Sequence, residues 1–225
     1  MRLNLNVAGF DQDLEIPEAD LENRYRPLVE AILNLEDGSG GRKIVFLAGP
    51  PGCGKSTLAA AVGALAGGLY HKTVTVLPMD GFHFPNAYLD AHGLRHRKGA
   101  PESYDRVRFA DALRRLHQGE KLAWPVYDRN IHDPVPDAVP VPPKGIFIVE
   151  GNYLLLDEPG WRELGHLADL KVFIMGVEEA LVDRLIGRHV RGGKTPDQAR
   201  DWVNRLDREN IRRVLASRRT PDREF

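Results

Sequence analysis

Four mainly apolar runs divide the chain and predict buried strands. They cover residues 44–48, 74–79, 146–149 and 170–175. The run at 44–48 is unbroken, which is typical of a strand buried on both faces, the arrangement of a parallel sheet. A glycine-rich turn and an alanine-rich helix over residues 58–66 separate the first two runs, so this part predicts a right-handed βαβ unit. The pattern predicts an α/β fold with a parallel sheet and helices on both faces.

The first 41 residues have a weaker pattern. Residues 3–7 alternate between apolar and polar side chains, and residues 19–35 carry apolar side chains at helical spacing. The glycine-rich segment 38–41 follows and predicts a flexible joint. We therefore expect a helical preface over residues 1–41 and a main domain over residues 42–225.

The residues between the second and third apolar runs are more polar. Residues 81–107 show no sustained period, and a loop of this length is usually functional. A short amphipathic helix is predicted over residues 109–116. Six prolines lie within residues 124–143, so this segment cannot form a helix or a central strand.

The C-terminal part of the chain is helical and basic. Residues 178–190 predict a helix that a Gly-Gly pair ends. Thr195 and Gln198 then match a capping box, so a long helix is expected from there to about Ser217. Residues 184–223 contain 12 Lys or Arg and only 5 Asp or Glu, an excess that a phosphate-facing element would need.

The composition limits the classes of protein to which this chain can belong. The chain has 225 residues, a formal net charge of −1 and a single cysteine. The balanced charge gives no general attraction to nucleic acids or membranes, and one cysteine cannot form an internal disulfide. No stretch approaches the ~18 apolar residues of a membrane span. We expect a cytoplasmic protein whose partners include neither nucleic acid nor membrane.

The most specific motif is a phosphate-binding loop of the form G-x-x-x-x-G-K-[ST]. It lies between a predicted strand and a predicted helix, as this motif requires. Backbone N–H groups point at phosphate oxygens, Lys55 reaches the β- and γ-phosphates, and the Ser56 hydroxyl binds Mg²⁺. The predicted cofactors are therefore ATP and Mg²⁺. The predicted phosphate-binding residues are Gly49, Pro50, Pro51, Gly52, Cys53, Gly54, Lys55, Ser56 and Thr57.

A carboxylate is needed beside this loop to complete the Mg²⁺ site. Glu150 directly follows an apolar run and can hold the ion through its water shell. Asp157 and Glu158 look like the Walker B residues of a transporter ATPase, but the upstream signature of such ATPases is absent from the sequence. Residues 90–93 match the D-x-x-G of GTPases, yet the sequence has no [NT]-K-x-D to bind guanine. Glu150 is the preferred acidic ligand.

Asp80 ends the second apolar run. Ligands of doubly wound sheets bind at the carboxyl ends of the strands, so Asp80 and the phosphate-binding loop are expected to open on one crevice. A carboxylate there can orient an acceptor hydroxyl and take its proton during phosphoryl transfer. The alternative is a turn aspartate that caps its own backbone.

Several motifs together resemble the phosphoribulokinase, uridine kinase and bacterial pantothenate kinase family. They are the phosphate-binding loop, M-D-G-F-H at 79–83, K-G-A-P-E-S-Y-D at 98–105, P-V-Y-D at 125–128 and V-E-G-N-Y-L at 149–154. The D-G-F-H and E-G-N-Y-L-L forms look most like the small kinases named after fructose transport systems. The resemblance spans roughly residues 42–220.

This resemblance implies a P-loop mononucleotide-binding fold, with Asp80 as the general base, Lys55 and Ser56 as ligands of phosphate and Mg²⁺, and Glu150 as the acid of the Mg²⁺ site. Members usually end with another sheet strand, and the short C-terminal remainder leaves open whether that strand exists. The resemblance also implies an acceptor pocket near His83, Tyr104, Tyr127, Arg129 and Asn152.

A lid is predicted near residues 184–210. Arg184, Arg188 and Arg191 have the spacing that puts three side chains on one helix face. Arg184 and Arg188 are the expected catalytic contacts to the transferring phosphoryl group, where one arginine can contribute ~10³ in rate. A merely solvated basic face is the alternative. A nucleic-acid footprint is disfavoured because acidic residues interrupt the basic ones.

The sequence thus predicts an ATP-dependent kinase that phosphorylates a hydroxyl of a small polar metabolite, such as a sugar, a nucleoside or a pantothenate-like molecule. The competing hypothesis is a transporter-type or regulatory P-loop ATPase without a small-molecule acceptor. A transition-metal site at His92 and His96 is disfavoured because no third ligand has a convincing spacing. The identity of the acceptor, the preferred nucleotide and a homodimer stay open.

Overall fold

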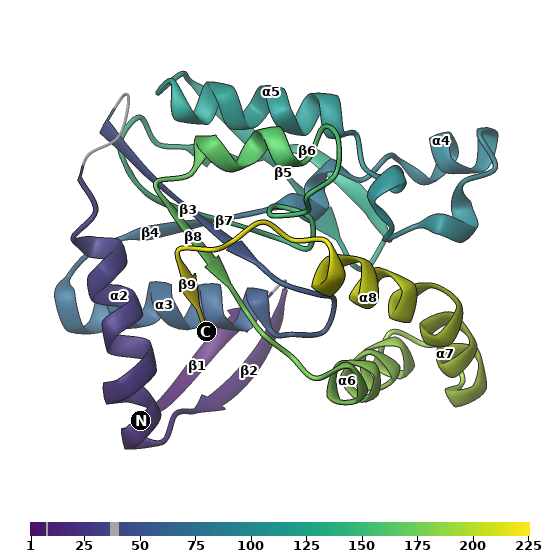
Figure 1. Cartoon of the computed structure of the whole chain (residues 1–225), viewed down its shortest axis with the longest axis horizontal. Coiled ribbons are helices and arrows are strands. Elements are labelled where there is room, and N and C mark those ends of the chain that lie inside the picture. The colour runs from purple at the N-terminus through teal and green to yellow at the C-terminus, as the bar shows by residue number, and fades with distance from the viewer. Residues whose placement is uncertain (8, 37–40) are drawn as a thin grey trace.

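The computed structural model describes residues 1–7, 9–36 and 41–225. Its centre is a five-stranded sheet in the order β4-β7-β3-β8-β9, in which every neighbouring pair is parallel (Figure 1). The four apolar runs of the sequence all lie in this sheet, so the predicted α/β class is confirmed. The strands are β3 (Arg42–Ala48), β4 (Val74–Pro78), β7 (Gly145–Gly151), β8 (Leu170–Phe173) and β9 (Arg223–Glu224).

Helices cover both faces of the sheet (Figure 1). α2 (Arg26–Leu33) and α3 (Lys55–Tyr70) pack on one face, and α5 (Arg106–His117) and the 3-10 helix η6 (Arg162–Leu167) pack on the other. Successive buried residues of β3 alternate between the two cores, because side chains along a strand point to opposite faces. This burial on both sides explains the unbroken apolar run of β3.

The N-terminal part begins with a β-hairpin that the sequence pattern did not reveal. β1 (Arg2–Val7) and β2 (Phe10–Glu15) pair antiparallel, and β1 packs on α3. Most side chains of β2 are acidic or amide groups, which gives no apolar signal. The expected helical preface therefore includes this hairpin, followed by α1 (Glu18–Asp20), the π-helical turn η1 (Leu21–Tyr25) and α2. Most of the predicted joint, residues 38–40, lies outside the described residues.

The polar segment after β4 is built of short helical turns. Turns of this length are too short to give a hydrophobic period, which is why the sequence predicted a loop. Prolines and glycines separate the turns along this stretch. The turns are η3 (Met79–Phe82), α4 (Asn86–Ala91), η4 (Arg95–Arg97) and η5 (Pro101–Ser103).

The proline-rich segment forms a separate two-stranded sheet. β5 (Leu122–Asp128) and β6 (Asp133–Val141) pair antiparallel, and the register shifts between Trp124 and Val126. Pro125 lies at this shift, where a missing N–H donor does no harm. The hairpin packs on η3 and stays outside the central sheet, which confirms the exclusion of a central strand.

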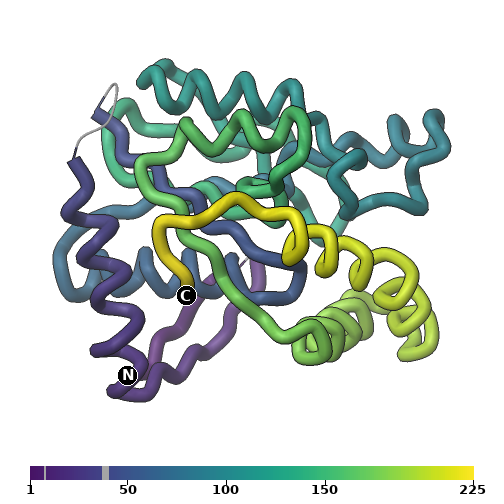
Figure 2. Tube along the Cα trace, in the orientation of Figure 1, coloured from purple at the N-terminus to yellow at the C-terminus, as the bar shows by residue number. Residues whose placement is uncertain are grey.

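After β8 the chain forms a helical region at one end of the sheet (Figures 1 and 2). α6 (Glu178–Arg191) is followed by α7 (Pro196–Trp202), which starts with the predicted capping box at Thr195. The expected long helix is confirmed: α7 continues without a break through the π-helical turn η7 (Val203–Asp207) into α8 (Arg208–Ala216).

From α8 the chain returns across the sheet to β9, which pairs with β8 (Figure 2). β9 has only two residues, so a final strand exists but is very short. Among the described residues, no helix combines the length and the apolar character needed to cross a membrane.

Candidate active site

The phosphate-binding loop connects β3 to α3 at the carboxyl edge of the sheet. Gly52 and Gly54 have φ angles of +81° and +94°, a conformation that favours glycine and lets the backbone curl around an anion. The buried Lys55 ammonium group donates to the carbonyl oxygens of Gly49 and Pro50, each at 3.0 Å. The loop and its lysine thus have the curled form that the motif predicted.

Close packing fixes this loop between β8 and α6. A Cβ atom on Gly49 would lie 2.7 Å from Cys53 Sγ and 2.8 Å from the Ile174 carbonyl oxygen. A Cβ atom on Gly52 would lie 3.0 Å from Cγ of Leu185, which is fully buried in α6. The apolar face of α6 therefore lies against the loop, and Cys53 is a buried packing residue.

Ser56 and Glu150 meet at the start of α3. The Ser56 hydroxyl donates to Glu150 Oε1 at 3.1 Å, because β7 pairs with β3 in a register that sets Glu150 opposite Leu47. Burial, followed by the negative charge of Asp80, raises the pKa of the Glu150 carboxyl. A buried carboxylate whose ionisation is disfavoured gains most from a nearby cation.

The oxygen donors of this pair fit Mg²⁺, which prefers one or two protein oxygens together with phosphate oxygens and water. Within the described ranges, no group of three or more His, Cys, Asp or Glu side chains could hold a metal ion by itself. A Mg²⁺ ion at Ser56 and Glu150 would therefore take its remaining ligands from the nucleotide and from water.

Asp80 lies in η3, directly after β4. Its carboxylate Oδ1 accepts a hydrogen bond of 3.0 Å from the Tyr104 hydroxyl. Burial opposes ionisation of Asp80, but the charges of His83 and Arg129 and the bond from Tyr104 outweigh it and lower the pKa. The carboxylate is therefore ionised and oriented at neutral pH.

The neighbouring Gly81 explains part of the D-G-F-H motif. A Cβ atom at this position would overlap the backbone of Pro125 and Val126 in β5. The indole N–H of Trp124 also donates to the Pro78 carbonyl oxygen at 2.9 Å. The proline-rich hairpin thus holds the turn that carries Asp80.

Three aromatic rings pack together beside Asp80. The His83 ring lies 3.9 Å from the Tyr104 ring and 5.3 Å from the Tyr127 ring, measured between centroids. Burial, and then the charge of Asp80, raises the pKa of Tyr104 well above its usual value and that of Tyr127 to about 12. Both phenols stay protonated, so they can donate hydrogen bonds in this wall.

Two arginines also act on this region. Arg129 lies in the turn between β5 and β6, and its charge lowers the pKa of Asp80 and of Glu150. Arg188 of α6 also lowers the pKa of Asp80, although its residue is exposed to solvent. Neither guanidinium group forms a hydrogen bond or ion pair with another described residue. Both are free to bind a ligand from opposite elements.

The other predicted site residues are less clearly engaged. Arg184 is exposed on α6, and within the described part of the chain it forms no hydrogen bond or ion pair with Asp80. Asn152 follows β7 and is half-buried, without a hydrogen bond to another described residue. The arginine spacing alone could not distinguish Arg184 from Arg188, because their distance from Asp80 depends on how α6 packs.

Three further residues support the site and were not singled out from the sequence. Gln12 of β2 donates to the Thr57 hydroxyl oxygen at 3.0 Å, although 45 residues separate them. Tyr153 donates to the Gly99 carbonyl oxygen at 2.6 Å. Lys98 lies 5.0 Å from the Tyr127 ring centroid. Tyr153 and Lys98 lie within quoted motifs, whereas nothing in the sequence pairs Gln12 with Thr57.

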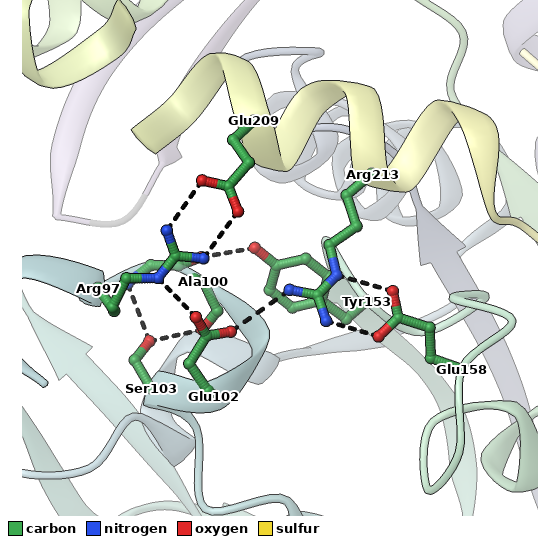
Figure 3. Close-up of polar contacts among 9 residues, drawn as sticks. Arg97, Ala100, Glu102, Ser103, Tyr153, Glu158, Glu209 and Arg213 are labelled. Atoms are coloured by element: carbon green, nitrogen blue, oxygen red, sulfur yellow. Dashed lines mark hydrogen bonds and ion pairs between the residues drawn. The ribbon is translucent and has the colours of Figure 1, made fainter. Parts of the chain in front are cut away.

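A chain of ion pairs joins the segment 95–103 to α8 (Figure 3). Arg97 contacts Glu209 at 2.9 Å and Glu102 at 2.6 Å. Arg213 contacts Glu102 at 3.4 Å and Glu158 at 2.6 Å. The hydrogen bond with Glu209 raises the pKa of Arg97, and the bond with Arg213 lowers the pKa of Glu158. The network thus connects the segment 95–103, which directly precedes Tyr104, to α8 in the helical region.

Comparisons with known proteins identify the family of this chain. A model of the phosphoribulokinase / uridine kinase family matches residues 44–210. "Uncharacterized protein YggC" of Escherichia coli K12 is 40% identical over 221 residues, covering 97% of this chain and 92% of the relative. "Putative uridine kinase C227.14" of Schizosaccharomyces pombe is 34% identical over 191 residues, covering 80% and 81% of the two chains.

A solved structure shares most of this architecture. The crystal structure of a "putative fructose transport system kinase" from Silicibacter sp. TM1040 has a TM-score of 0.82 and 35% identity. The match covers 88% of this chain and 97% of that chain. The resemblance noted from the motifs is therefore confirmed at the level of both sequence and fold.

Proposed function

The chain belongs to the phosphoribulokinase / uridine kinase family of P-loop kinases, and from this premise we propose that it transfers the γ-phosphoryl group of ATP to a hydroxyl of a small polar metabolite. The acceptor class includes sugars, nucleosides and pantothenate-like molecules. One observation carries the proposal: Asp80 and Glu150 follow or end neighbouring strands of the sheet, β4 and β7, at the same carboxyl edge. The Tyr104 hydroxyl holds the Asp80 carboxylate by a hydrogen bond of 3.0 Å.

In this reaction Asp80 accepts the proton of the acceptor hydroxyl. A bond forms between that oxygen and the γ-phosphorus as the bond from the γ-phosphorus to the β,γ-bridging oxygen breaks, leaving ADP. The ionised state of Asp80 at neutral pH suits this role, because a general base must be unprotonated before the step. Tyr104 donates to the carboxylate and so orients it toward the acceptor.

The remaining groups neutralise phosphate charge. Lys55 exchanges its two backbone carbonyl partners for the β- and γ-phosphates. Arg188 extends from α6 to the transferring group, and Arg184 is a second candidate on the same helix. Bound Mg²⁺ supplies charge neutralisation of the phosphates, and Ser56 and Glu150 are the residues that would hold it.

The proposal is tested by a screen of hydroxyl acceptors in which ADP release is measured with and without each compound. We expect acceptor-dependent release with at least one sugar, nucleoside or pantothenate-like compound, and none with Lys55→Ala. ATP hydrolysis that no acceptor stimulates would instead favour a regulatory or transporter-type P-loop ATPase.

A further inference from the structure

Gln12 is a polar residue at an inward position of the N-terminal hairpin. Exposure alternates along β2, so Gln12 faces the protein while its two neighbours face solvent. Across the hairpin Gln12 pairs with Leu5, which is only 3% exposed. This face of the hairpin lies along α3 (Figure 1). The other residues of the face are all apolar: Leu3, Leu5, Val7, Phe10 and Leu14.

The amide of Gln12 reaches the first turn of α3. Its nitrogen donates to the Thr57 hydroxyl oxygen at 3.0 Å, and Thr57 directly follows Lys55 and Ser56 of the phosphate-binding loop. An amide nitrogen can only donate, so the hydroxyl oxygen accepts this bond and its own proton is available for another acceptor. Within the described ranges, no protein group accepts that proton.

Thr57 also offers a backbone donor. The first backbone hydrogen bond of α3 runs from the Leu58 N–H to the Gly54 carbonyl oxygen at 2.9 Å. The N–H groups of residues 55–57 therefore have no acceptor within the helix. Two donors of Thr57 thus lie at the positive end of a 16-residue helix, where an anionic oxygen is the matching partner.

The hydroxyl groups of Ser56 and Thr57 contact different parts of the protein. Ser56 donates to Glu150 at the end of β7, and β7 is the neighbour of β4, which Asp80 follows. Thr57 contacts the hairpin instead. Ser56 thus belongs with the groups proposed to act on Mg²⁺ and the transferring phosphoryl group, and Thr57 with a different part of the nucleotide.

We propose that Gln12 is a positioning residue for the nucleotide, which directs the Thr57 hydroxyl proton to an oxygen of a phosphate that stays in ADP. This inference rests on the proposed kinase function. Gln12 acts through Thr57: its bond fixes the hydroxyl before the nucleotide arrives, which lowers the cost of ordering it on binding. The hairpin lies outside residues 44–210, to which the family model matches, so it adds a segment to the nucleotide site.

The first test removes the donor of Gln12. Gln12→Met keeps the length of the side chain and suits the apolar face, but it cannot donate a hydrogen bond. We expect the Kd for ADP with Mg²⁺, measured by calorimetry, to rise about 3- to 10-fold, in the range of one hydrogen bond. The KM for ATP should rise by a similar factor, and kcat should stay close to the wild-type value, because the contact is to a phosphate that is not transferred.

A second variant tests the direction of the bond. The carboxylate of Gln12→Glu can only accept, so it would take the Thr57 proton away from the nucleotide and add a negative charge near the phosphates. We expect ADP to bind more weakly than to Gln12→Met. Binding as tight as in the wild type would mean that the Thr57 proton is not used by the nucleotide, and it overturns the proposal.

A double-mutant cycle separates positioning from a merely structural role. Thr57→Val removes the hydroxyl group and keeps the shape of the side chain. In this background we expect Gln12→Met to have no further effect on the Kd for ADP, since both residues act through one bond. A fall in affinity as large as in the wild-type background would show that Gln12 acts independently of Thr57.

The same hairpin offers a matched control. The Asn4 amide nitrogen donates to Asp13 Oδ1 at 3.1 Å, across the same two strands, and both residues are exposed. Asn4→Leu therefore removes a hydrogen bond of the hairpin on the face away from α3. We expect this variant to bind ADP as the wild type does. A loss equal to that of Gln12→Met would assign the effect to the stability of the hairpin and overturn the role of Gln12.

The outcomes distinguish this inference from the function on which it rests. An unchanged Kd for ADP in Gln12→Met overturns the role of Gln12, while the kinase function stands. If the wild type binds neither ADP nor ATP, the proposed kinase function fails and the role of Gln12 fails with it.

Discussion

Arginines at the two edges of the central sheet have opposite environments. At the amino edge, Arg42 starts β3 and is only 1% exposed. Its guanidinium group donates to the carbonyl oxygens of Pro142, Leu116 and Glu120 at 2.9 to 3.2 Å. At the carboxyl edge, Arg129 and Arg188 lie near Asp80 without a hydrogen bond to any described residue.

This difference fits a structural role for Arg42 and the proposed ligand-binding role of Arg129 and Arg188. The carbonyl groups around Arg42 include that of Leu116 in the last turn of α5, where the regular helical hydrogen bonds end. The guanidinium donors of Arg42 are therefore used by carbonyl groups of the protein, and little hydrogen-bonding capacity is left for a ligand. The charges of Arg129 and Arg188 both lower the pKa of Asp80, so the two guanidinium groups act on the same place. Unpaired like charges at one place fit a site that is completed by an anion.

The largest expected effect is on Arg188. Arg188→Gln should lower kcat by about 10³-fold, since one arginine at a transferring phosphoryl group contributes on this order. Steady-state kinetics with the identified acceptor measures the change, and Arg184→Gln is compared in parallel. A larger loss of kcat for Arg184→Gln would show that Arg184, and not Arg188, contacts the transferring phosphoryl group. Thermal melting of Arg188→Gln without nucleotide should match that of the wild type.

The next effect concerns Asp80. Asp80→Asn should lower kcat by roughly 100-fold or more, because the amide keeps the shape of the side chain but cannot take a proton. ATP affinity, measured by calorimetry, should change little. Poor ATP binding with normal turnover would make Asp80 a nucleotide ligand instead of a base.

Arg42 should show the reverse pattern, with an effect on stability and little on catalysis. Arg42→Met should lower the free energy of unfolding by about 2 kcal/mol, because several buried carbonyl groups lose their donor. Urea denaturation measures this loss, and kcat at a temperature where the variant is folded should be close to the wild-type value. A large fall in kcat without loss of stability would erase the contrast between the two edges.

The smallest effect is a pH-dependent change in stability at Glu150. The pKa of Glu150 is raised in the folded state, so ionisation of this carboxyl destabilises the fold. The stability that the neutral carboxyl allows is therefore lost as pH rises from the pKa of the unfolded chain through the pKa of the folded protein. Glu150→Gln should therefore melt a few degrees higher than the wild type at pH 8 without Mg²⁺. The two proteins should converge below about pH 4.5, where both side chains are neutral.

Addition of Mg²⁺ and ATP sharpens this last test. The wild type should gain more melting temperature than Glu150→Gln, because the ionised carboxylate then has a cation to pair with. An equal gain in both proteins would remove Glu150 from the metal site.

Much of the site could be predicted because its residues follow strands directly along the chain. The phosphate-binding loop, Asp80 and Glu150 each lie at the end of an apolar run, and parallel strands bring such ends to one edge. The same reasoning gave the four main strands. It did not give β2, whose polar side chains carry no hydrophobic signal.

The sequence alone therefore determined the fold class, the phosphate-binding loop and the carboxylates of the site, because local patterns and strand ends encode them. Only the tertiary structure decided that Arg188 of α6 is among the charges that lower the pKa of Asp80, and that Gln12 reaches Thr57. These features depend on how helices and hairpins distant in sequence pack against each other. The free energy of such packing is spread over many long-range contacts, and no short segment of the chain contains it.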